Sequence, residues 1–301
     1  MVERKKGGGD DLALPEKNEA VKVAIRCRPL NEKELAQGNQ QVVSINRARH
    51  EIMVQRPFQQ EDPKQFTFDL VYGADAEQAN IYAETASPII ANVLEGYNGT
   101  MFAYGQTGCG KTHTMMGPSH KDGPEAVPED DRGIIPKTIR HIFGFIDGAD
   151  KETKFLVRCS YLEIYNEKVL DLLSGNNDQS GLQIKEDPQK GTYVKDLTSV
   201  ITKSVTETEK ALFAGLKGRK VGATAMNADS SRSHSIFTIY IETSQNDPIT
   251  GKQKIKAGKL NLVDLAGSER QSKTQATGVR LDEAKAINVS LSVSYNSNLS
   301  I

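Results

Sequence analysis

The spacing of apolar residues along the chain alternates between a strand-like period of two and a helical period. Residues 21–27, VKVAIRC, alternate as a strand does, and three short strand candidates follow within residues 41–69. Residues 77–96 have helical periodicity and stop at Gly96, which suits a C-terminal cap. Residues 99–104, GTMFAY, are short, apolar and aromatic, as expected of a buried strand. This order of elements predicts an α/β fold.

The second half of the chain continues the interleaving with longer elements, and neither an internal repeat nor a coiled-coil heptad is visible. A Gly/Pro-rich acidic segment, residues 117–133, predicts a surface loop. Ser204 or Thr206 can cap the second of two further helices. The predicted helices are 134–146 and 204–218, and the predicted strands are 154–165, 234–243 and 252–266. We therefore expect one α/β domain with a mixed sheet.

The composition is that of an ordinary globular protein. The chain has 301 residues, of which 37% are hydrophobic and 26% charged, and its net charge is −1. No global field draws it to nucleic acid or membrane, and no apolar run is long enough to span a bilayer. Three cysteines, far apart and without CxxC spacing, favour a reducing compartment. Residues 1–20 lack the apolar core of a signal peptide and predict a flexible polar tail.

The stretch 105–112, GQTGCGKT, has the spacing of a phosphate-binding loop. Gly105, Gly108 and Gly110 allow a tight turn whose N–H groups face an anion. Lys111 can place its ammonium on the β- and γ-phosphates, and the hydroxyl of Thr112 can bind Mg²⁺. A predicted strand precedes the loop and a possible helix follows it, so an accidental glycine turn is the weaker interpretation. The stretch predicts a site for a nucleoside triphosphate and Mg²⁺.

Two further segments can sense a terminal phosphate. Asp264 ends an apolar strand in an Asp-x-x-Gly pattern, where it can hold the Mg²⁺ shell, and Gly267 can offer its N–H to a γ-phosphate. The polar stretch 227–235, NADSSRSHS, can close over a nucleotide. Ser231 in that stretch can reach the metal or the attacking water, and Arg232 can pair with Glu269 if both segments fold inward. The alternatives are a simple turn for the first segment and a solvated loop for the second.

The combination of FAYGQTGCGKTHTM, NADSSRSHS and VDLAGSER, with IRCRPL near the start, resembles the motor domain of kinesins over residues 21–292. The resemblance implies a phosphate-loop ATPase with a mixed central sheet flanked by helices on both faces, using ATP and Mg²⁺ and engaging microtubules. A weaker similarity in YVKDLTS and the Ser-rich stretch is to the ciliary transport branch, with the motor at the N-terminus. Cytoplasm and cytoskeleton are the implied location, with the cilium as the finer possibility.

The resemblance also assigns roles to individual residues. It implies that Arg232 and Glu269 form a latch between the two switch segments. The implied adenine-side residues are Arg26, Arg28 and Pro29, with His113 as a stacking face. The implied phosphate-loop residues are Gly105, Gln106, Thr107, Gly108, Cys109, Gly110, Lys111 and Thr112. The implied catalytic residues are Asn227, Ser231, Arg232, Gly267 and Glu269, and the metal-side residues are Thr112, Ser231 and Asp264.

Microtubules are the implied partner, with neither nucleic acid nor membrane as a partner. The implied microtubule-facing segments are 186–199 and 270–292; the second carries Arg270, Lys273, Arg280 and Lys285, which suit acidic tubulin tails. Dimerisation would need a stalk that this chain does not contain. A charged solvated face is the alternative interpretation of the second segment.

The end of the chain departs from the family pattern. After INVSLS it reads VSYNSNLSI, residues 293–301, a poor helix former, where the family continues through further helices, a strand and a neck linker. We therefore expect a truncated motor domain, incomplete at its C-terminus. The main alternative function is a non-motile fragment that holds ATP and Mg²⁺ without gripping microtubules. A GTPase would need an Asn/Thr-Lys-x-Asp motif after residue 269, and a small-molecule kinase would need an Arg-rich lid; neither is present.

Overall fold

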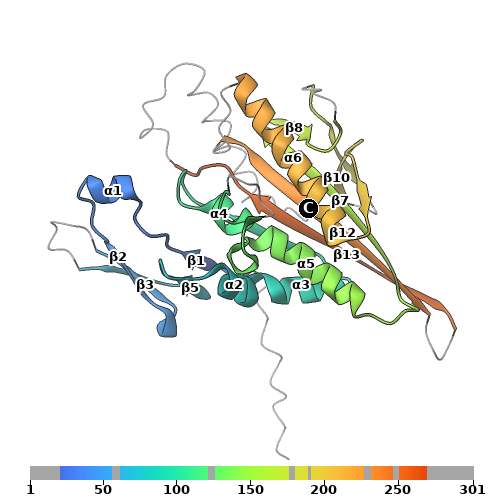
Figure 1. Cartoon of the computed structure of the whole chain (residues 1–301), viewed down its shortest axis with the longest axis horizontal. Helices are drawn as coiled ribbons and strands as arrows, with labels where there is room; N and C mark the ends of the chain where they lie inside the picture. The colour runs from blue at the N-terminus through green and yellow to red at the C-terminus, as the bar shows by residue number, and fades with distance from the viewer. Residues whose placement is uncertain are drawn as a thin grey trace, which may run out of the picture. The chain divides into compact units, whose positions relative to one another are not determined.

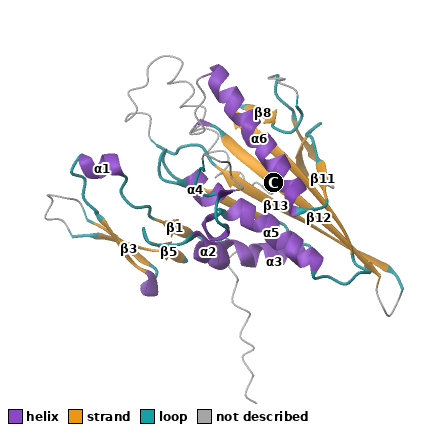
Figure 2. Cartoon of the chain, viewed as in Figure 1, coloured by secondary structure: helices purple, strands orange, loops and turns teal. Residues whose placement is uncertain are grey.

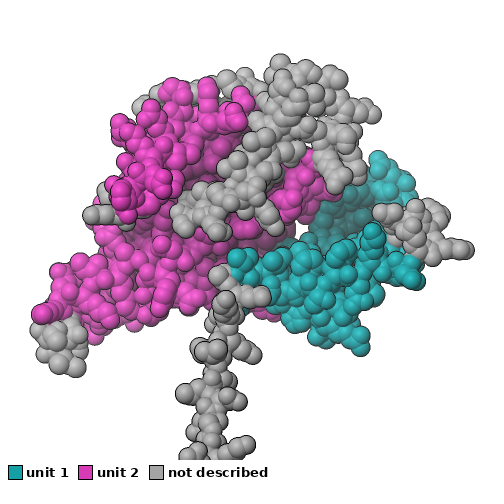
Figure 3. All heavy atoms as spheres, turned by 180° about the vertical axis from the view of Figure 1, so that it is seen from behind, with its two compact units in different colours: residues 1–74 teal, residues 75–301 magenta. Residues whose placement is uncertain are grey.

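The structure is a computed structural model that describes residues 21–55, 62–120, 126–175, 180–188, 191–226, 232–246 and 251–269. Within residues 220–226 it describes the backbone only. The chain divides into two compact units, residues 1–74 and residues 75–301 (Figure 3). Each unit is described by itself below.

The described residues of the first unit form two small sheets, one short α-helix and a 3-10 turn at Arg47–Arg49. Strand β1 (Ala24–Arg26) pairs in parallel with β5 (Leu70–Tyr72). Strands β2 (Val43–Asn46), β3 (Glu51–Val54) and β4 (Lys64–Thr67) form an antiparallel sheet, which confirms the three short strands predicted within 41–69. Helix α1 (Glu32–Ala36) was not predicted, although Asn31 and Glu34 form its capping box.

The second unit is built on a six-stranded sheet in the described part of the chain (Figure 1). Its order is β11-β7-β12-β13-β6, with β8 paired to β7. Strands β13 and β6 run parallel and the other neighbours run antiparallel, so the predicted mixed sheet is confirmed. The strands are β6 (Gly99–Ala103), β7 (Lys154–Tyr165), β8 (Lys168–Asp171), β11 (Val200–Thr202), β12 (His234–Asn246) and β13 (Gln253–Asp264). A separate hairpin joins β9 (Ile184–Asp187) and β10 (Gly191–Val194).

The predicted helices are confirmed, with two differences in detail (Figure 2). The helix predicted over 77–96 is interrupted by a π-helical turn, Tyr82–Ala86, and Gly96 follows it with a left-handed φ of 98°. The helix predicted over 204–218 continues to Met226, and Ser204 accepts a hydrogen bond from the backbone N–H of Glu207. The helices of this unit are α2 (Gln78–Ile81), α3 (Ser87–Leu94), α4 (Lys111–Met116), α5 (Ile134–Asp147) and α6 (Val205–Met226).

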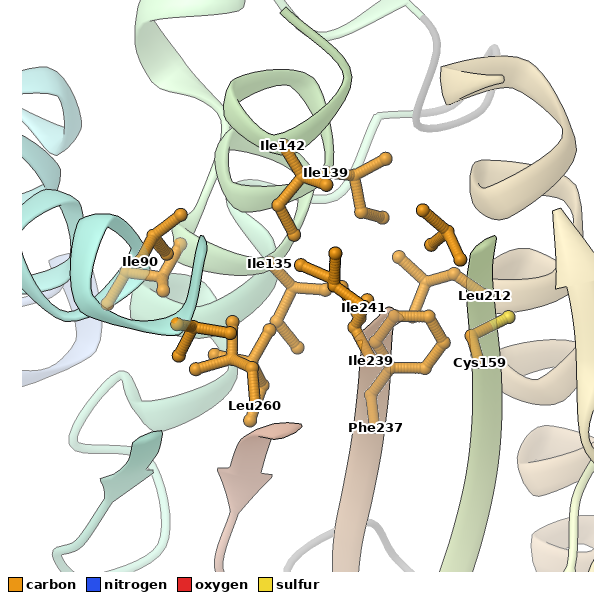
Figure 4. Packing of buried hydrophobic residues seen from close by; sticks show 14 of the residues in the cluster. Ile90, Ile135, Ile139, Ile142, Cys159, Leu212, Phe237, Ile239, Ile241 and Leu260 are labelled. Carbon is orange, nitrogen blue, oxygen red and sulfur yellow. The ribbon is translucent and has the colours of Figure 1, made fainter. Parts of the chain in front are cut away.

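The main core lies where apolar rows cross the sheet and meet the helices (Figure 4). Strand register places Tyr161, Phe237 and Leu262 in one row across β7, β12 and β13. The next row contains Cys159, Ile239 and Leu260. Helices α3, α5 and α6 cover these rows with Ile90, Ile139, Leu212 and other buried side chains. The period-two pattern of the strands therefore buries one face against the helical stripes.

The opposite face of the sheet has a smaller cluster, formed by Leu162, Val169, Ile236 and Val263 with partly buried neighbours. Phe102 on β6 is 62% exposed and Tyr104 after it is 65% exposed. The prediction that 99–104 is buried is therefore wrong for these positions, because only alternate side chains of β6 face the helices. The resemblance implied helices on both faces; the helix residues of the main core pack on the first face.

The predicted surface loop at 117–133 is partly buried. Arg132 is only 8% exposed and its guanidinium donates to the Glu209 carboxylate of α6 at 3.0 Å. Val127 is buried as well. The acidic, Gly/Pro-rich composition predicted exposure to solvent. Arg132 is buried instead, and the carboxylate of Glu209 compensates its charge. The prediction was wrong for Arg132 because its partner, Glu209, lies 77 positions away in the sequence.

Candidate nucleotide site

The predicted phosphate loop lies between β6 and α4, as expected from the sequence. Gly105, Gly108 and Gly110 have φ values of 151°, 77° and 100°, which only glycine adopts readily. A Cβ at Gly105 would also approach the thiol of Cys109 to 2.6 Å. The glycine spacing therefore follows from the backbone path of the loop.

Lys111 begins α4 and folds back over the loop. Its ammonium donates to the carbonyl oxygens of Gly105 at 2.9 Å and Gln106 at 3.1 Å. These bonds hold a positive charge against the loop backbone. A phosphate oxygen can replace the carbonyls as acceptor, since an anion makes stronger hydrogen bonds to ammonium than a neutral carbonyl does.

Thr112, in the first turn of α4, contacts Asp264 at the end of β13. The Thr112 hydroxyl donates to Asp264 Oδ2 at 2.7 Å, although 152 residues separate them. Asp264 is 5% exposed, and its other oxygen, Oδ1, is buried without a hydrogen-bond partner among the described residues. A hydroxyl that gives its proton to the carboxylate keeps lone pairs for a cation, and the orphaned Oδ1 can accept from a metal-bound water. These two residues therefore fit Mg²⁺, and their role as metal-side residues stays a prediction.

The segment after β13 contacts the phosphate loop directly. The backbone N–H of Ser268 donates to the Gly105 carbonyl at 3.1 Å. Glu269 accepts from the backbone N–H of Thr107 at 2.9 Å and from its hydroxyl at 2.6 Å. A Cβ at Gly267 would overlap both the Glu269 carboxylate and the Thr107 hydroxyl, so this close approach requires glycine. The predicted second switch segment therefore lies against the loop.

Glu269 is held as a carboxylate. Burial raises the pKa of Glu269. The two hydrogen bonds from Thr107 and the charge of Lys111 lower it by more, so the pKa lies below that of an ordinary glutamate. The predicted pairing of Glu269 with Arg232 stays a prediction. In this structure the described hydrogen bonds of Glu269 go to Thr107.

His234 joins the start of β12 to the segment after β13. Its Nδ1 accepts from the backbone N–H of Ala266 at 3.1 Å, which places the proton of the neutral ring on Nε2. Burial, with the positive charges of Arg219 and Lys111, lowers the pKa of His234 to about 4. A neutral imidazole is therefore the form present at neutral pH.

Sequence reasoning missed Arg219 and Glu163, which lie beside Asp264. The Arg219 guanidinium is 3.2 Å from Glu163 Oε1 and 3.7 Å from Asp264 Oδ2. It also donates to Ser233 and Ser235. A signal was present: Glu163 occupies a position of the strand 154–165 where the alternation calls for an apolar residue facing the helices.

The roles of the remaining predicted residues stay predictions. Asn227 and Ser231 lie outside the described residues, as does the segment 270–292. Arg26, Arg28 and Pro29 belong to the first unit, where Arg28 pairs with Glu34 at 2.6 Å. The carbonyl of His113 accepts from Gln78 Nε2 at 2.6 Å, which ties α4 to α2. The segment 186–199 includes the end of β9 and all of β10.

A Gly-Lys-Thr turn after one strand, joined through its threonine to the aspartate that ends the parallel neighbour, is the arrangement of phosphate-loop nucleotide-binding proteins. The fold and the site therefore define the class. The family model described as kinesin motor domain matches residues 26–296, and the chain belongs to this family.

Individual relatives agree with this family. The chain is 47% identical to kinesin-like protein klp-20 of Caenorhabditis elegans over 92% of this chain and 41% of the relative. It is 44% identical to kinesin-like protein KIF3C of Bos taurus over 93% of this chain and 37% of the relative. A solved fast kinesin matches with a TM-score of 0.78 and 42% identity over 89% of this chain and 71% of that one. The chain thus spans less than half the length of the two curated relatives.

None of the helices in the described residues is both long and apolar enough to cross a membrane.

Proposed function

We propose that this chain is an ATP-hydrolysing motor domain that binds microtubules and couples release of the γ-phosphate to that binding. The observation that carries the proposal is the meeting of the phosphate loop with the segment 264–269 through two pairs, Thr112 with Asp264 and Thr107 with Glu269. Because both pairs join the loop to one segment, loss of a terminal phosphate can shift that segment by changing which of these contacts form.

The residues of the loop have separable roles in this proposal. Lys111 neutralises phosphate charge, and Thr112 with Asp264 would hold Mg²⁺. Bound Mg²⁺ neutralises charge that develops on the β- and γ-phosphate oxygens. Gly267 offers its N–H to the γ-phosphate. Glu269 leaves Thr107 when the segment closes, and its carboxylate then helps to order the attacking water.

The remaining assignments extend the proposal to residues that the sequence singled out. Asn227, Ser231 and Arg232 contribute to the switch that closes over the phosphates, with Arg232 pairing with Glu269. Arg26, Arg28, Pro29 and His113 flank the adenine. The motor domain spans 21–292, between a tail at 1–20 and a divergent end at 293–301. The family model matches residues 26–296.

Microtubules are the proposed partner, contacted through 186–199 and 270–292. The solved fast kinesin is described in terms of its ATPase mechanism and its interactions with microtubules, and at 42% identity this supports the same activity here. Cytoplasm and cytoskeleton are the proposed location, with the cilium as its finer form. A stalk beyond this chain would dimerise the motor.

The test is ATP turnover with and without polymerised tubulin, on the 301-residue chain and on a chain extended by a complete motor C-terminus. We expect tubulin to stimulate the extended chain. Co-sedimentation with microtubules in a non-hydrolysable ATP analogue separates a gripping motor from a fragment that only holds nucleotide. Turnover that tubulin leaves unchanged in both chains would contradict the motor function.

A further inference from the structure

A polar row crosses the sheet at the end nearest the phosphate loop. Strand register places Glu163, Ser235 and Asp264 side by side on β7, β12 and β13. This row lies two residues beyond the apolar row of Tyr161, Phe237 and Leu262, and therefore on the same face. The helix α6 that covers the apolar rows also covers this one, and it contributes Arg219.

All three guanidinium nitrogens of Arg219 contact either this row or Ser233, the residue before β12. Its Nε is 3.2 Å from Glu163 Oε1, its Nη1 donates to Ser235 Oγ at 3.2 Å, and its Nη2 donates to the carbonyl and hydroxyl oxygens of Ser233 at 3.2 and 3.0 Å. The side chain is 7% exposed. A planar fork can bond to acceptors in several directions at once, which a lysine ammonium on a flexible stem does not reproduce.

The guanidinium also acts on the metal-side carboxylate. Asp264 Oδ2 lies 3.7 Å from Arg219 Nη1 and accepts from the Thr112 hydroxyl, whereas Oδ1 has no hydrogen-bond partner among the described residues. One carboxylate oxygen thus lies against Thr112 and Arg219, and the other is left to accept a hydrogen bond from a metal-bound water.

We propose that Arg219 is a positioning residue that orients Asp264 toward the Mg²⁺ of the bound nucleotide. The inference rests on the proposed function and adds a residue to it. Partners that orient the groups around a metal typically change metal affinity by about 10–100-fold when they are replaced. Arg219→Lys preserves the charge and removes the fork, so it separates orientation from electrostatic attraction.

The experiment measures release of fluorescently labelled ADP from the 301-residue chain as free Mg²⁺ is varied. We expect Arg219→Lys to raise the Mg²⁺ concentration for half-maximal ADP retention by roughly 10–100-fold. The release rate in EDTA should equal that of the wild type, since the phosphate loop itself is unchanged. Loss of stability alone would alter thermal unfolding without moving the Mg²⁺ midpoint.

Arg132→Lys is the matched control. Arg132 is also buried, 8% exposed, and also pairs with a carboxylate, Glu209 of α6. We expect the same substitution there to lower the melting temperature and leave the Mg²⁺ midpoint at its wild-type value. An equal shift of the midpoint in Arg132→Lys, or an unshifted midpoint in Arg219→Lys, would overturn the proposal.

If circular dichroism shows that Arg219→Lys does not fold, Ser235→Ala replaces it in the test. This variant removes one acceptor of the guanidinium from the polar row and should raise the midpoint by a smaller factor. An unchanged midpoint in Ser235→Ala would then refute the positioning role. A wild-type chain that binds no labelled ADP, or releases it at a rate independent of Mg²⁺, would instead refute the proposed nucleotide function itself.

Discussion

Two glycines inside helices predict opposite effects of the same substitution. Gly215 in α6 is buried, and a Cβ there would overlap the ring of Tyr161. Gly144 in α5 is exposed, and a Cβ there would meet nothing within 4 Å. We therefore expect Gly215→Ala to destabilise the protein and Gly144→Ala to stabilise it.

The magnitudes follow from two terms. Alanine is favoured over glycine inside a helix by about 1 kcal/mol, and this gain applies at both positions. At Gly215 it is opposed by overpacking, which costs about 1–3 kcal/mol where neighbours cannot move. Tyr161 is 2% exposed and packs edge-to-face on Phe237 with ring centroids 5.4 Å apart, so its ring has little room to yield. The overpacking cost at Gly215 is therefore taken from the upper part of that range, about 2–3 kcal/mol, so the net change is about −1 to −2 kcal/mol for Gly215→Ala and about +0.5 to +1 kcal/mol for Gly144→Ala.

Thermal unfolding followed by circular dichroism measures both effects. For a chain of this size 1 kcal/mol corresponds to roughly 2–4 °C, so the two variants should fall on opposite sides of the wild type by a few degrees. An increase in melting temperature for Gly215→Ala equal to that of Gly144→Ala would refute the packing argument. It would mean that the Tyr161 ring moves aside at negligible cost.

Three further changes test the site and its electrostatics. Glu269→Ala removes the carboxylate that Thr107 binds, so we expect single-turnover ATP hydrolysis to fall by roughly 100-fold or more while ATP affinity is retained; normal turnover would contradict its role. Thr112→Ala should bind ATP equally weakly in Mg²⁺ and in EDTA by calorimetry, and an intact Mg²⁺ effect would exclude Thr112 as a ligand. The pKa of His234 is about 4 when folded and 6.5 ordinarily, so the unfolded chain takes up its proton first and stability falls from pH 6.5 toward pH 4 by up to about 3 kcal/mol. Urea unfolding between pH 7.5 and 4.5 should show a smaller loss for His234→Gln, whereas parallel curves would contradict the assignment.

Local patterns were sufficient to predict the longer helices and strands and the phosphate loop. The loop is contiguous, and its glycines, Lys111 and Thr112 are set by backbone geometry and phosphate chemistry within eight residues. Asp264 became a candidate because it ends an apolar strand in an Asp-x-x-Gly pattern, for which a simple turn was the alternative interpretation. In each case the physical cause lies in the neighbouring sequence.

Contacts between distant segments were not predictable in the same way. In the sequence, Arg219 is one of several charged residues in and just after a predicted helix. Only the strand register shows that Glu163 and Asp264 lie in one row, where both carboxylates are close to its guanidinium. Arg132 reads as part of a polar loop until its distant partner Glu209 is known. A buried arginine is tolerated only with such a partner, and a single sequence does not identify partners.

The position of the site follows from the parallel pair in the described sheet. Because β6 and β13 run in the same direction, their carboxyl ends reach the same edge, and the register pairs Ala103 with Asp264. The phosphate loop leaves β6 at the point where the acidic residue ends β13. A shift of one residue in this register would turn Asp264 to the opposite face and away from Thr112 and Arg219. The apolar rows of the core hold this register, so the packing that stabilises the fold also fixes the geometry of the metal-side carboxylate.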